Sequence, residues 1–126
     1  MTSRTKIGTP ILDERKRVPA RFYATPLGSE PVRDWLKGLA VDARRRIGFD
    51  LKQLEYGWPV GMPLCRPLGR SLWELRSSLP DGRIARVIFC VRDGELLLLE
   101  GFIKKTQKTP PQEIELALQR MRGMGR

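Results

Sequence analysis

Hydrophobic and polar residues recur in short blocks along the chain, and each block in the first half predicts one element. Residues 18–25 (VPARFYAT) are rich in apolar and aromatic side chains and end in turn residues, which predicts a first strand. Over 29–39 and 42–56 the apolar residues recur every three or four positions, which predicts two amphipathic helices. Residues 58–70, rich in proline and glycine, read as a long irregular connection.

The second half predicts three strands followed by a helix. Apolar and polar residues alternate over 72–77 (LWELRS), and Asp-Gly pairs mark the turns before and after a strand at 83–92. The next strand, 95–103 (ELLLLEGFI), contains a run of leucines that predicts cover on both its faces. A last helix follows over 111–121, and Thr109 is a candidate for its N-terminal cap.

The order β, α, α, β, β, β, α predicts one α+β domain over residues 18–122. We expect a small, twisted antiparallel sheet with an N-terminal helical hairpin and a C-terminal helix, the helices lying on one face. Residues 1–17 show neither a helical nor a strand period, so they read as a flexible basic arm. Residues 123–126 read as a short tail.

Composition narrows the possible chemistry. The 126 residues contain no histidine, which excludes Ser-His-Asp and Cys-His triads and paired-histidine acid–base catalysis. Two cysteines, Cys65 and Cys90, are too few for a zinc site, so we expect neither a metal nor another cofactor. No apolar run approaches the roughly 20 residues of a spanning helix, and the start lacks the pattern of a secretory signal. We therefore expect a cytoplasmic protein without a membrane partner.

The 24 Lys plus Arg outnumber the 14 Asp plus Glu and give a formal charge of +10, which favours a polyanionic partner. A well-solvated basic surface is the alternative. Neighbouring strand ends converge in an antiparallel meander, so cations on different strands form one patch there. Arginine grips phosphate oxygens and lysine stabilises a developing charge, which suits RNA cleavage without histidine. The cations of interest are Arg66, Arg70, Arg76, Arg83, Arg86, Lys104, Lys105 and Lys108.

Three segments carry a resemblance to a known family: LWELR at 72–76, RIARVIFCV at 83–91 and GFIKKTQKTPPQEIELALQR at 101–120. They are similar to the HigB branch of the RelE/HigB (ParE/RelE) superfamily of type II toxin-antitoxin toxins. This branch is phage-derived, and its members end in an F-x-K-K-x-Q-K-T-P segment followed by a helix. The resemblance spans about residues 20–122.

The resemblance implies a RelE-like, microbial-RNase-like fold and a ribosome-dependent mRNA endoribonuclease that inhibits translation without a metal. The implied partners are a cognate helix-turn-helix antitoxin, the 70S ribosome with its mRNA, and operator DNA through the antitoxin complex only. Arg76 resembles the family's phosphate-contacting arginine, and Glu74 and Arg86 match more loosely. Lys104, Lys105 and Lys108 resemble its basic cluster. We expect Arg76, Lys104, Lys105 and Glu74 to be catalytic and the other cations to bind RNA.

The chain departs from the family in two ways. It lacks the histidines of some HigB proteins, and it lacks the C-terminal tyrosine of RelE-like ones, because Pro111 falls about where that tyrosine would be. The general base therefore stays open between Glu74 and the RNA itself. Glu74 and Arg76 can equally be a salt-bridged pair on one strand face. A non-catalytic RNA- or DNA-binding module and a degenerate toxin are the alternative functions. Residues 44–46 (RRR) form a solvated helix face or contact ribosomal RNA or acidic antitoxin residues.

Overall fold

The computed structural model describes residues 17–123. Its elements are β1 (Ala20–Phe22), α1 (Pro31–Lys37), α2 (Val41–Gly57), β2 (Cys65–Gly69), β3 (Leu72–Ser78), β4 (Ile84–Arg92), β5 (Glu95–Lys104) and α3 (Pro111–Gly123). The arm expected over 1–17 lies outside the described residues except for Arg17, and so does the tail expected over 123–126 except for Gly123, which ends α3. None of the described helices is long and apolar enough to cross a membrane.

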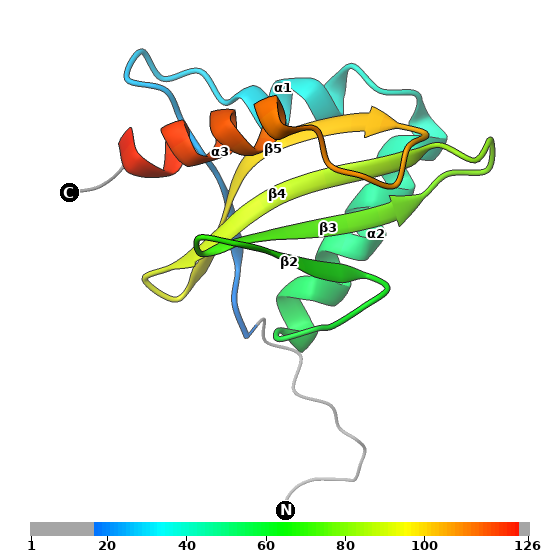
Figure 1. Cartoon of the computed structure of the whole chain (residues 1–126), viewed down its shortest axis with the longest axis horizontal. Helices are drawn as coiled ribbons and strands as arrows, with labels where there is room; N and C mark the ends of the chain where they lie inside the picture. Colours follow the sequence, from blue (N-terminus) through cyan, green and yellow to red (C-terminus); the bar gives the residue numbers. More distant parts are fainter. Residues whose placement is uncertain (1–16, 124–126) are drawn as a thin grey trace, which may run out of the picture.

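The strands form one sheet in the order β1-β5-β4-β3-β2 (Figure 1). The meander predicted from β3 through β4 to β5 is confirmed, because each of these strands pairs antiparallel with the next. The prediction of an antiparallel sheet is wrong for β1, which pairs in parallel with β5 and is shorter than expected. No tight turn joins β1 to β5, so hairpin geometry does not set the direction of β1.

Helices cover both faces of the sheet, so the prediction that they share one face is wrong (Figure 1). On one face, Ile47 and Leu54 of α2 pack in a core with Leu75 and Phe89. On the other, α3 packs in a second core through apolar residues that include Leu118. The physical reason is the leucine run of β5, predicted to be covered on both faces, whose members are all at most 1% exposed.

Strand β2 lies inside the stretch that was predicted to be an irregular connection. It pairs antiparallel with β3 although it contains Pro67, which has no backbone N–H to donate. The strand order places β2 at an edge of the sheet, where one side of the strand needs no partner and proline is tolerated. Because of this proline, the sequence pattern did not predict β2, which extends the sheet beside β3.

A close contact fixes α1 on the sheet. The ring of Trp35 in α1 lies directly against the backbone of Gly101 in β5. A Cβ atom at position 101 would clash with the ring carbons Cε3 and Cζ3 of Trp35. Glycine is thus required here for the approach of the helix to the strand.

We predict that Gly101→Ala lowers the free energy of unfolding by about 2–3 kcal/mol, because the added methyl group displaces a large aromatic ring from a packed layer. Urea denaturation monitored by tryptophan fluorescence measures the change. The control is Gly48→Ala in the middle of α2, where a Cβ meets nothing within 4 Å. There, alanine should stabilise the protein by up to about 1 kcal/mol. Equal stability of the two variants would contradict this packing account.

Candidate functional site

Charged side chains gather on the α3 face of the sheet. Arg66 of β2 is paired in register with Glu74 of β3, and Arg76 of β3 is paired with Arg86 of β4. Residues two apart on a strand share a face, so Glu74 and Arg76 lie on the same side as Leu72, which belongs to the core under α3. Three of the predicted cations and the predicted carboxylate therefore come together on adjacent strands.

The loop between β5 and α3 binds these three arginines, which we call the arginine cluster. Arg76 Nη2 donates to Gln107 Oε1 at 2.8 Å, and Arg76 Nη1 reaches the Gln107 carbonyl oxygen at 3.4 Å. Arg66 Nη1 donates to the same carbonyl oxygen at 3.4 Å. Arg86 Nη2 donates to the carbonyl oxygen of Thr106. Oxygen atoms of the loop are thus the ligands of all three guanidinium groups.

The carboxylate of Glu74 links the arginine cluster to the loop between β5 and α3. Its side chain is fully buried, with Oε1 accepting a hydrogen bond from Arg76 Nη1 at 2.8 Å and Oε2 accepting one from the Thr109 hydroxyl. The salt-bridged pair considered from the sequence is therefore present. Thr109 is not placed as the predicted helix cap, because its hydroxyl donates to this buried carboxylate and α3 begins at Pro111. Both Glu74 oxygens are engaged.

Arg86 is the most deeply buried cation of the cluster. Its side chain is 0% exposed, and its Nε and Nη1 atoms have no hydrogen-bond partner among the described residues. Burial lowers the pKa of Arg86, and the positive charges of Arg76 and Arg66 lower it further, against the effect of Glu74. The cluster places three guanidinium groups near the carboxylate of Glu74, which pairs with Arg76, and this leaves an excess of positive charge that suits an anion.

The three predicted lysines belong to the segment that binds the arginine cluster. Lys104 is the last residue of β5, and Lys105 and Lys108 belong to the loop. All three side chains are exposed. The loop that binds the arginines through its oxygens therefore presents ammonium groups to solvent, where they can meet a polyanion.

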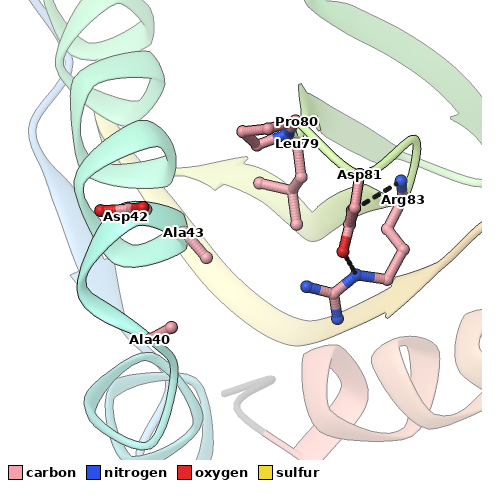
Figure 2. Close-up of a pocket in the computed structure, with 7 residues that line it drawn as sticks. All are labelled: Ala40, Asp42, Ala43, Leu79, Pro80, Asp81 and Arg83. Carbon is pink, nitrogen blue, oxygen red and sulfur yellow. Dashed lines mark hydrogen bonds and ion pairs between the residues drawn. The ribbon is translucent and has the colours of Figure 1, made fainter.

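Two predicted cations do not join the cluster. Arg70 follows β2 and its Nη2 donates to Glu115 of α3 at 3.4 Å, with both side chains more than half exposed. Arg83 forms an ion pair of 2.6 Å with Asp81 and borders a pocket on the opposite, α2 side of the sheet (Figure 2). The pocket has a volume of about 230 Å³. Its other lining residues are Ala40, Asp42, Ala43, Leu79, Pro80 and Asp81.

Glu113 in the first turn of α3 was not singled out from the sequence. Burial raises its pKa to about 7, together with a side-chain hydrogen bond to Glu100 of β5 and the repulsion between the two carboxyls, while Lys104 acts in the opposite sense. An acidic residue at a helix start is ordinarily explained by the helix dipole. Only the approach of α3 to β5 brings Glu113 close to Glu100 and to Lys104, a predicted catalytic residue.

The thiol groups offer no ready nucleophile. Burial, with a smaller effect of Glu74, raises the pKa of Cys65 to about 11, and burial also raises the pKa of Cys90. Both thiols therefore stay protonated at neutral pH. Between residues 17 and 123, no three or more acidic or cysteine side chains are grouped as metal ligands.

We predict that stability falls as pH rises from about 5 to about 8. The pKa of Glu113 is higher in the folded chain, so the folded state holds a proton that the unfolded state has lost, and this contribution disappears as pH passes about 7. Glu113→Gln should remove about 1 kcal/mol of that dependence in urea titrations, while the exposed control Glu115→Gln should keep it. A Glu113→Gln protein with the wild-type pH dependence would refute the carboxyl pair.

Comparison with protein families matches residues 34–122 to the family described as phage derived protein Gp49-like (DUF891). The match begins in α1 and ends in α3, so it includes the arginine cluster and its loop. Comparison with curated proteins finds no match. The matched family consists of RelE/HigB-like toxins of toxin-antitoxin systems. The chain belongs to this Gp49-like family of phage-derived toxins.

Proposed function

We propose that this chain is a HigB-type toxin that cleaves mRNA on the ribosome and so inhibits translation. The observation that carries the proposal is the arginine cluster, in which Arg66, Arg76 and Arg86 lie on adjacent strands and Arg76 pairs with the carboxylate of Glu74. The end of β5 and the loop that follows it also carry the exposed side chains of Lys104, Lys105 and Lys108. A concentration of cations of this kind binds a nucleic-acid backbone by neutralising its phosphates.

The ligands already bound by the cluster indicate how a phosphate would bind. Arg76 holds an amide oxygen and a carbonyl oxygen of Gln107, and Arg86 holds the carbonyl oxygen of Thr106. A phosphate diester offers charged oxygens to the same guanidinium groups. Charged oxygens bind guanidinium groups more strongly than the neutral oxygens of the loop do.

The proposed reaction is transesterification within the RNA. The ribose 2′-oxygen attacks the adjacent phosphorus, the bond from phosphorus to the 5′-oxygen breaks, and a 2′,3′-cyclic phosphate and a 5′-hydroxyl result. Lys104, Lys105 and Arg76 stabilise the negative charge that develops on the phosphorane. One group takes the proton of the 2′-hydroxyl and another returns a proton to the leaving oxygen.

Glu113 is our candidate for the base, in place of Glu74. Both oxygens of Glu74 accept hydrogen bonds and the side chain is buried, so its role is to position Arg76. Glu113 interacts with Lys104, and the pKa of Glu113, about 7, matches the pH of the cytoplasm where translation occurs. The proposed partners are the 70S ribosome with its mRNA and the antitoxin, with operator DNA reached through the antitoxin complex.

We expect primer extension on a defined mRNA to show cleavage only when translating ribosomes are present. Arg76→Ala and Lys104→Ala should each reduce the cleavage rate by about 100-fold, because each removes a charge that stabilises the transition state. Lys37→Ala is the control, since this exposed lysine ends α1 on the other face of the sheet. It should cleave as the wild type does.

The alternatives give different results in the same assay. A pure binding module would tolerate Lys104→Arg with a modest loss of affinity, whereas a transition-state contact would lose rate steeply. Cleavage of free RNA would contradict ribosome dependence but keep the nuclease. Absence of cleavage with and without ribosomes would favour the binding module or the degenerate toxin, and growth arrest on induction would exclude the latter.

The pH dependence of cleavage tests the base. With Glu113 as base, the rate should rise about tenfold per pH unit below about 7 and level off above it, because only the ionised carboxylate accepts the proton. Glu113→Gln should abolish this rise and lower the plateau, while Glu115→Gln should leave the profile unchanged. A rise that persists in Glu113→Gln would assign the base to another group.

A further inference from the structure

The outer face of α2 exposes large apolar side chains. Val41 is 48% exposed, Phe49 56% and Tyr56 42%. The opposite side of the helix, with Ile47 and Leu54, is buried against the sheet. Residues spaced three or four apart lie on one side of a helix, so positions 41, 45, 49, 52 and 56 form one stripe directed away from the core. We call it the α2 stripe.

Positive charge accompanies these apolar groups. Arg45 and Lys52 occupy the remaining positions of the α2 stripe, and both are exposed. Arg46 lies beside it with its guanidinium carbon 5.8 Å from the centroid of the Phe49 ring. Asp42 is the one exposed acidic residue on the helix, because Asp50 and Glu55 are buried. The surface therefore complements a segment that is both apolar and acidic.

We propose that the α2 stripe binds an acidic amphipathic segment of the antitoxin. Apolar side chains of that segment cover Phe49 and Tyr56, and its carboxylates face Arg45 and Lys52. The inference rests on the chain being the toxin of a toxin-antitoxin pair. Val41 gives no advantage to RNA binding, and a second copy of this chain would place like charges against each other.

The α2 stripe and the arginine cluster lie on opposite sides of the sheet (Figure 1). The helix α2 covers one face, whereas the loop and α3 lie over the other. An antitoxin segment on the α2 stripe therefore leaves the arginine cluster uncovered. Changes on α2 should alter antitoxin affinity without altering the cleavage machinery, which makes the two sites separable by experiment.

The test measures the affinity of the purified chain for the antitoxin, taken as the protein encoded beside it, by isothermal titration calorimetry. Phe49→Glu and Arg45→Glu should each raise Kd by about tenfold or more, because each places a negative charge against an acidic segment. Val91→Glu is the matched control, since Val91 is 41% exposed at the end of β4. The control should bind as the wild type does.

Each outcome bears on the inference separately from the proposed function. Equal affinities of Phe49→Glu, Val91→Glu and wild type would overturn the inference. Loss of ribosome binding in Phe49→Glu with unchanged antitoxin affinity would also overturn it and make the α2 stripe an RNA contact. Loss of antitoxin binding while wild type and variants cleave mRNA equally would support it. The same loss with an inactive wild type would support the α2 stripe and refute the nuclease.

Discussion

The buried carboxylate of Glu74 is the constraint on which the geometry of the site depends. A carboxylate removed from water is stable only where charge and hydrogen bonds replace its hydration, and Arg76 and Thr109 supply both. Arg76 lies two residues along the same strand, whereas Thr109 comes from the loop after β5. The interaction therefore holds the loop and the start of α3 against β3. It also sets the orientation of Arg76 toward Gln107.

Burial of β4 and β5 on both faces separates two surfaces. The central strands give the cluster a rigid base on the α3 side, because their side chains pack in a second core on the α2 side. The outer face of α2 and the loop after β5 then carry exposed groups on opposite sides of the sheet. If helices covered one face of the sheet only, the α2 stripe and the arginine cluster would not be separated by the sheet. The two-sided core thus separates the RNA site and the antitoxin site that we propose, one on each side of the sheet.

Periodicity within a segment predicted the elements well, and contacts between distant segments account for what it missed. Alternation over 72–77 predicted that Glu74 and Arg76 share a face, and the leucine run of β5 predicted two covered faces. The same patterns do not specify which face of the sheet a helix covers after a loop. The prediction that α3 lies on the same face as the other helices was therefore wrong. Pro67 concealed β2, and Glu113 gained significance only through Glu100. Arg83 shows the same limit, because its turn places it on the α2 side.

Arg86 is electrostatically costly in the folded chain, and the proposed function accounts for that cost. A buried cation loses its hydration, and here two of its nitrogens lack partners while Arg76 and Arg66 repel it. A hydrophobic residue at this position would pack against Phe102 without that cost. An anion bound at the cluster would offset the excess positive charge that Arg76 and Arg66 impose on Arg86. In the proposed function that anion is an RNA phosphate, which lowers the electrostatic cost of holding three cations together.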